Sequence, residues 1–103
     1  MEHLSKIIVT GEIMARIDSV DDVLRLSLEH VHRSRAEPGC LMHSVHQDVE
    51  DSLRVVFVEH WEDKAALATH FAVPASGAFV AGLADLTEGR PTLDIYDATP
   101  TSL

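Results

Sequence analysis

Four stretches of the chain place apolar residues at every second position, which is the period of a β-strand with one buried face. They cover residues 6–16, 40–48, 55–62 and 91–98. One face of the third stretch carries Val55, Phe57, Glu59 and Trp61, and its other face is also largely apolar. A strand that is apolar on both faces has to be covered on both. The pattern therefore predicts helices on one face of a sheet and a further layer on the other.

Three other stretches carry apolar residues at helical spacing. They cover residues 19–36, 63–73 and 74–86. Ser19 followed by Asp22 resembles a capping box, and Asp63 is a suitable N-cap. Pro74 separates the second helix from the third, because proline disfavours helical backbone at the residue before it. The expected buried stripe of the first helix is Val20, Val23, Leu24, Ser27, Leu28 and Val31.

The order of these elements is typical of a ferredoxin-like α+β fold, βαββαβ, with a four-stranded antiparallel sheet. We expect one domain over residues 1–103, with a core of residues 6–98 and a loose tail of residues 99–103. A turn near residues 49–52 would place His43 opposite Glu59 on the same face. The uncovered face would expose Ile8, Met14, Val56 and Val58. This patch predicts a homodimer that packs sheet against sheet.

Composition limits the possible binding partners and the location of the protein. Eight Lys and Arg against 17 Asp and Glu give a net charge of −9, which disfavours nucleic acid and anionic membranes. The longest uncharged run, residues 65–84, is rich in alanine and is interrupted by His70, Pro74 and Gly77, so no membrane span is expected. No export signal is visible, which favours the cytoplasm. Cys40 is the only cysteine and has no partner for an intrachain disulfide.

Several short motifs resemble the antibiotic biosynthesis monooxygenase (ABM) family of dimeric α+β barrels. They are EPGC at residues 37–40, E-x-W-E-D at residues 59–63, A-L-x-x-H at residues 66–70, and Pro74. The resemblance covers residues 7–96. It implies a dimeric α+β barrel, and the family includes cofactor-free oxygenases of quinols and anthrones, haem-degrading enzymes and an isomerase branch.

The resemblance also suggests roles for single residues. Trp61 matches the pocket Trp of the anthrone-oxidising members, and His70 matches a histidine of the quinol-oxidising ones. Phe57 and Leu67 stand where the anthrone enzyme has Asn and Tyr. The chain has no Asn, which counts against the haem-degrading branch, and Ala75 stands where the isomerase branch has a second His.

A cofactor-free oxygenase needs a base, an apolar pocket and a flat wall, because the deprotonated substrate itself reduces dioxygen. We expect His70 or His43 as the base and Glu59 as the carboxylate that orients it. The expected substrate-binding residues are Trp61, Phe57, Leu67 and Phe79. The predicted function is oxidation of a small hydroxylated aromatic or quinol by dioxygen, without a cofactor.

Structural roles compete with each of these assignments. His70 could instead stabilise the end of its helix, His43 could be a half-buried strand residue, and Glu59 could form a structural hydrogen bond. The same residues would then serve a non-catalytic protein that binds a small ligand or acts in a stress response. An acid–base isomerase is a third possibility if two ionisable groups meet in a cavity too small for a planar ring.

The remaining histidines do not suggest a metal site. No two of them have the HxxxH spacing with a supporting acid, and His43 and His46 point to opposite faces of one strand. His60 is expected on the outer face of the sheet. Solvent positions are expected for His3, His30 and His32. The sequence therefore predicts no metal.

Overall fold

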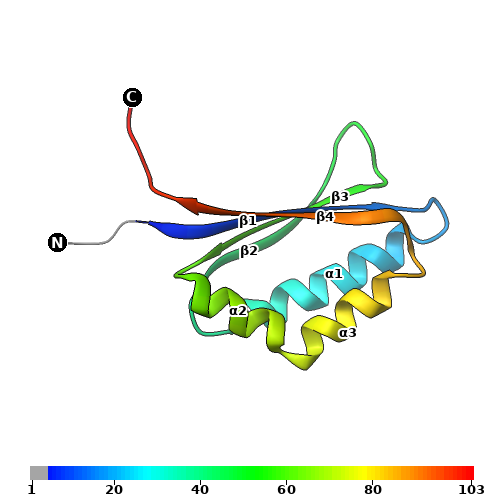
Figure 1. Cartoon of the computed structure of the whole chain (residues 1–103). Helices are drawn as coiled ribbons and strands as arrows, with labels where there is room; N and C mark the ends of the chain where they lie inside the picture. Colours follow the sequence, from blue (N-terminus) through cyan, green and yellow to red (C-terminus); the bar gives the residue numbers. More distant parts are fainter. Residues whose placement is uncertain (1–4) are drawn as a thin grey trace.

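The computed structural model describes residues 5–103 and contains the predicted α+β fold, with one four-stranded antiparallel sheet and three helices (Figure 1). The strands are β1 (Lys6–Ala15), β2 (Cys40–Gln47), β3 (Arg54–Trp61) and β4 (Thr87–Ala98). The helices are α1 (Val20–Ser34), α2 (Lys64–Ala72) and α3 (Pro74–Leu83). Residues 99–103 form neither helix nor strand. The last strand begins four residues before the predicted start at Pro91, because the chain joins the sheet directly after α3.

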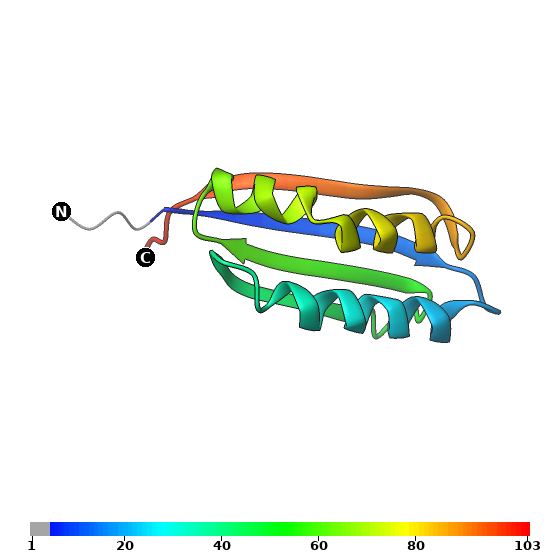
Figure 2. The same ribbon diagram turned by 90° about the horizontal axis from the view of Figure 1, so that it is seen from below.

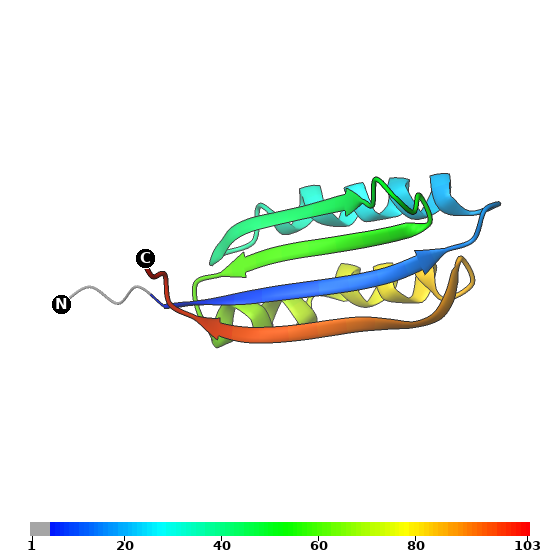
Figure 3. The same ribbon diagram turned by 90° about the horizontal axis from the view of Figure 1, so that it is seen from above.

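The sheet has the strand order β2-β3-β1-β4, which Figure 3 shows from its uncovered face. Every neighbouring pair is antiparallel. In the β2–β3 hairpin His43 lies opposite Glu59, as the turn length predicted. This register places both side chains on the face that the helices cover.

All three helices lie on one face of the sheet (Figures 1 and 2). Seen from below, α1 lies on the β2 side and the bent pair α2 and α3 on the β4 side (Figure 2). In residues 5–103 no single helix is both long and apolar enough to cross a membrane, and α2 and α3 meet that criterion only as a pair bent by 67°.

Two details of α1 differ from the prediction. Ser19 forms no side-chain cap, because its hydroxyl donates instead to the Leu86 carbonyl oxygen at 2.6 Å and ties the helix start to the turn between α3 and β4. Leu28 is 46% exposed rather than buried. Val23, Ser27 and Val31 are buried as predicted, and the buried stripe also includes His30 and Ser34.

The layer between sheet and helices has two unlike ends. One end, called here the apolar end, is built from Ile13, Ala15, Val23, Val31, Val55, Phe57 and Leu83. The other end contains a small apolar cluster of Ile7, Val9, Trp61 and Leu67 beside buried polar side chains. The alternating faces of β1 and β3 produce both ends, since every second residue of each strand points toward the helices.

Candidate active site

A cavity of about 410 Å³ lies between the sheet and the helices. Its floor comes from Gly11 and Ile13 of β1 with Phe57 and Glu59 of β3. Its walls come from α2, α3 and residues 87–93, and they include His70, Phe71, Phe79, Val80, Leu83 and Leu93. Most of these side chains are apolar. The cavity is therefore suited to an apolar or aromatic molecule of small size.

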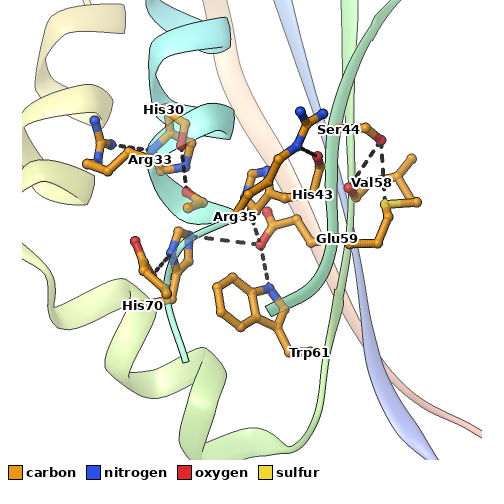
Figure 4. Close-up of polar contacts among 12 residues, drawn as sticks. His30, Arg33, Arg35, His43, Ser44, Val58, Glu59, Trp61 and His70 are labelled. Atoms are coloured by element: carbon orange, nitrogen blue, oxygen red, sulfur yellow. Dashed lines mark hydrogen bonds and ion pairs between the residues drawn. The ribbon is translucent and has the colours of Figure 1, made fainter. Parts of the chain in front are cut away.

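Buried polar side chains gather at one end of this cavity. His30 of α1, His43 of β2 and His70 of α2 are each at least 94% buried, and their ring centroids are 5.3–5.5 Å apart. We call these three residues the histidine cluster. Glu59 and Trp61 of β3 lie beside it, as the close-up in Figure 4 shows. Four different elements thus supply one polar site.

His70 is fixed through one ring nitrogen. Its Nδ1 lies 2.8 Å from Oε1 of Glu37, which is only 15% exposed, so the imidazole donates Nδ1–H to the carboxylate. Its other nitrogen, Nε2, lies 3.9 Å from Oε1 of Glu59. The Glu37 contact therefore leaves Nε2 as the nitrogen with a lone pair, beside a second carboxylate.

The turn that carries Glu37 depends on Gly39. Gly39 has φ +82°, and a Cβ at this position would lie 2.5 Å from the Cβ of Ala66 in α2. Its carbonyl oxygen accepts a hydrogen bond from the Glu62 amide at 2.8 Å, which ties the turn to the end of β3. Only glycine fits this conformation and this close approach. The EPGC segment thereby brings its glutamate to the histidine of A-L-x-x-H.

Glu59 is almost completely buried and is held by Trp61. The indole Nε1–H donates to its Oε1 at 2.8 Å, and Nε2 of His43 lies 3.4 Å from the same oxygen. Burial alone would raise the pKa of Glu59, but the contacts with His43 and Trp61 outweigh burial and leave this pKa lowered. Glu59 is therefore an anion on the cavity floor.

His30 was expected in solvent, and this expectation is wrong because its ring is 6% exposed and lines the cavity. The ring stacks on Phe79 with centroids 4.1 Å apart and planes 6° from parallel. Burial lowers the pKa of His30 to about 3, and the neighbouring His43 and His70 act in the same direction. The ring is therefore neutral. Its Nδ1 accepts a hydrogen bond from Nη2 of Arg33 at 2.6 Å (Figure 4).

The predicted site residues separate into two groups. His70, Glu59, Phe57 and Phe79 line the cavity. His43, Trp61 and Leu67 are buried beside it without lining it. Trp61 lies against His70 with ring centroids 4.6 Å apart, so the indole supports the imidazole from behind.

The other histidines within the described residues stay away from the cluster. His60, which pairs with Ile8 of β1, lies on the outer face of the sheet. His32 and His46 are exposed. His3 lies outside the described residues.

The sequence analysis missed two members of the site. His30 falls on the buried stripe of α1, four positions before Ser34 and seven after Val23, and this spacing is the signal that could have placed it inside. Glu37 belongs to the quoted EPGC motif, but the sequence suggested only a helix end there. Its contact with His70 depends on a turn geometry that the motif alone does not specify.

Chemically, the site joins a basic nitrogen to an apolar cavity. Nδ1 of His70 is held by one carboxylate, and a second carboxylate lies near Nε2, so both stabilise an imidazolium if Nε2 takes a proton. The cavity above it is lined mainly by apolar side chains, among which Val80 and Leu93 are 62% and 51% exposed. This arrangement can remove a proton from a molecule bound in the apolar cavity.

Solved structures share the fold closely. A protein described as an antibiotic biosynthesis monooxygenase is 31% identical, with a TM-score of 0.84 over 91% of this chain and 99% of that one. PA3566 from Pseudomonas aeruginosa is 27% identical, with a TM-score of 0.82 over 98% and 100%. A Deinococcus radiodurans protein of the same description has a TM-score of 0.89 over 94% and 96%, at 23% identity, which supports the fold alone.

Sequence comparison places the chain among the same proteins as the comparison of structures. The uncharacterized protein sll1783 of Synechocystis sp. is 33% identical over 95 residues, which are 92% of this chain. The chain spans 65% of the length of that relative. The family model described as antibiotic biosynthesis monooxygenase matches residues 6–82. The chain therefore belongs to the antibiotic biosynthesis monooxygenase family.

Proposed function

We propose that this protein is a cofactor-independent monooxygenase that oxidises a small hydroxylated aromatic or quinol-type molecule with dioxygen. The observation that carries the proposal is the pairing of His70 with Glu37 at the end of a largely apolar cavity. Family membership supports monooxygenase-like chemistry or small-molecule binding, and the substrate class is our inference from the cavity.

In this mechanism His70 acts as the base. Its Nε2 takes the proton of the substrate hydroxyl, while Glu37 and Glu59 stabilise the resulting imidazolium. The substrate anion passes one electron to dioxygen, and the two radicals combine at a ring carbon that still bears a hydrogen. The imidazolium returns its proton to the peroxide, which then loses water, with the hydrogen of that ring carbon, as its O–O bond breaks. One oxygen atom remains as a carbonyl, and the substrate supplies all the electrons.

The neighbouring residues have distinct proposed roles. Phe57 and Phe79, with ring centroids 5.9 Å apart, offer apolar surface to an aromatic ring. Glu59 orients the histidines, and Trp61 holds Glu59 through its Nε1–H. His43 is the second candidate for the base, but it lies beside the cavity rather than in its lining. Leu67 contributes packing beneath the site rather than a wall.

Dioxygen consumption tests the proposal. Metal-stripped protein is mixed with a panel of quinols and anthrones, and uptake is compared with the spontaneous background. We expect turnover that falls by about 100-fold or more in His70→Gln, which is the usual contribution of a positioned base. His60→Gln is the matched control, because His60 lies on the outer face of the same sheet. No uptake above background for any substrate would overturn the proposal.

Small-molecule binding without chemistry is the second candidate. The apolar character of most lining residues favours it, because such walls retain a ligand without needing reactive groups. Saturable binding of a quinol without dioxygen uptake would select it. The isomerase alternative is favoured by a cavity without room for a planar ring, and a volume of about 410 Å³ supports the oxygenase proposal instead.

The homodimer and the cytoplasmic location stay predictions. The outer sheet face carries no helix, and Tyr96 on that face, opposite Ile8, is 53% exposed, which favours association with a second copy. Measuring the molar mass in solution tests the dimer.

A further inference from the structure

The histidine cluster has a property that the proposed reaction does not use. Each of the three residues offers one ring nitrogen, and these three atoms lie within 4.8 Å of one another. All three side chains are buried, and they come from α1, β2 and α2. We propose that the histidine cluster binds one divalent transition-metal ion of the zinc type, with Glu59 as a neighbouring oxygen ligand.

His43 gives the strongest reason. Its side chain is completely buried, yet neither Nδ1 nor Nε2 has a hydrogen-bond partner among the described residues. A buried polar atom without a partner is costly, and native structures seldom keep one without a purpose. Nε2 is aimed at the cluster, 3.4 Å from Oε1 of Glu59. A metal ion would give this nitrogen a closer partner than the Glu59 carboxylate oxygen at 3.4 Å.

Glu37 supplies the support that metal-binding histidines need. A ligating imidazole usually donates its second ring N–H to a carboxylate, which fixes the tautomer and makes the ligand more basic. His70 has this arrangement, with Nδ1 2.8 Å from Glu37 and Nε2 directed toward Glu59. The tautomer that suits a metal ion is therefore already present.

The local charges favour a cation. Glu59 and Glu37 are both largely buried and face imidazoles, and Oε2 of Glu37 has no hydrogen-bond partner among the described residues. Three imidazoles with a carboxylate are typical of zinc, copper or nickel sites rather than magnesium or calcium sites. The net charge of −9 attracts cations to the chain as a whole.

The geometry needs a modest contraction. Zinc–nitrogen bonds of about 2.0–2.1 Å place tetrahedral ligand nitrogens about 3.4 Å apart, compared with the upper separation of 4.8 Å here. Side-chain rotations that move each nitrogen by about 1 Å would close this difference. The rings lie on three separate elements and contact one another, so they would move together toward the ion.

Arg33 opposes binding and so provides a sharp test. Its guanidinium donates to Nδ1 of His30, so Nδ1 is occupied and the imidazole proton lies on Nε2. Metal binding through Nε2 requires that proton to move to Nδ1, and the Arg33 contact then becomes repulsive. Removing the guanidinium should therefore tighten binding, an effect that a merely structural role for these residues would not produce.

Zinc chloride titrated into the metal-stripped full chain tests the site by calorimetry, and the absorption bands of cobalt(II) report its ligand geometry. We expect one ion per chain. His43→Leu should weaken binding by more than about 100-fold, beyond the loss caused by an outer-shell partner. Arg33→Met should tighten it by about 10-fold. The control is His46→Gln, an exposed histidine on the same strand, which should bind as the wild type does.

Two results would overturn the inference. One is the absence of stoichiometric binding in the wild type. The other is an affinity that is the same in the wild type, His43→Leu and Arg33→Met, which would show that zinc binds to surface histidines. If His43→Leu does not fold, the gain expected in Arg33→Met still decides the question.

Metal binding by the histidine cluster does not depend on the proposed oxygenase reaction. One consequence of binding, inhibition of that reaction, does depend on it. A lone pair on Nε2 of His70 cannot hold a metal ion and accept a proton, so zinc would also inhibit the proposed reaction. If zinc binds and no substrate is turned over, the inference stands and the proposed function fails.

Discussion

The two ends of the layer between sheet and helices are built by the same strands in opposite ways. At the apolar end β3 contributes Val55 and Phe57 to a continuous hydrophobic cluster. Two and four residues beyond Phe57, the same face contributes Glu59 and Trp61 to the polar end, next to the histidine cluster. One strand face therefore changes from structural packing to potential chemistry within a few residues.

The two ends differ in how much their buried side chains contribute to the free energy of folding. Burial of the apolar residues stabilises the fold by roughly 25 cal/mol per Å² of area removed from water. The polar end gains less, because a buried carboxylate and imidazole nitrogens without partners are costly to dehydrate. We infer that the polar end is kept for chemistry rather than for stability.

A carboxylate placed at the apolar end of β3 should have the largest effect on stability. Val55→Glu puts a charge at the apolar end, where Val55 is fully buried among hydrophobic side chains. We expect a loss of about 3–5 kcal/mol or more, the cost of an unpaired buried charge, and hence largely unfolded protein. Circular dichroism during urea unfolding measures this. Val49→Glu, at an exposed loop position, should change stability by less than about 0.5 kcal/mol.

Removing one donor at the polar end should have a smaller effect. Trp61→Phe keeps an aromatic ring but removes the Nε1–H that binds Glu59. A buried acceptor that loses its partner costs about 1–3 kcal/mol. Phe57→Leu is the matched change at the apolar end, where a hydrophobic replacement should cost less than about 1.5 kcal/mol. Equal losses in the two variants, by urea denaturation, would remove the distinction between the ends.

Glu37→Gln tests whether a residue of the polar end affects activity more than stability. The amide is nearly the same shape but lacks the charge that stabilises a protonated His70. We expect kcat to fall by about 10- to 100-fold if the proposed reaction is found, with little change in the unfolding midpoint. A variant that loses stability and keeps its activity would indicate a structural ion pair.

The smallest expected effect concerns Gly11, on the cavity floor. A Cβ there would meet its neighbours at 3.5–3.7 Å, which are ordinary contacts. Gly11→Ala should therefore stabilise the strand by about 0.5–1 kcal/mol, because glycine loses more backbone entropy on folding. Thermal unfolding tests this. A loss of stability would mean that the floor is packed too tightly for a methyl group.

The sequence contained most of the fold. The alternation in β1 and β3 predicted which residues are buried, and the hairpin register of His43 and Glu59 is confirmed. Both follow from local periodicity and turn length, which depend on residues close in the chain. The confirmed family resemblance rested on short motifs of the same kind.

The assembly of the site could not be predicted in the same way. The spacing of His30 fits the buried stripe of α1, but its stacking on Phe79 depends on how α1 packs against α3. Metal-ligand spacing in a sequence is visible only for histidines on one element, whereas the histidine cluster combines three elements. The capping box at Ser19 failed because a distant carbonyl, that of Leu86, takes the hydroxyl. Each of these contacts joins residues far apart in sequence.

The most direct test of a polar end kept for chemistry is the free energy of unfolding of His43→Leu. The side chain is completely buried without hydrogen-bond partners for its nitrogens, and leucine is similar in volume. We predict that the metal-free variant keeps the stability of the wild type to within about 1 kcal/mol, because removal of the unpaired Nδ1 offsets the lost contact between Nε2 and Glu59. A loss of about 2 kcal/mol or more would contradict the account and make the histidine cluster part of the structural core.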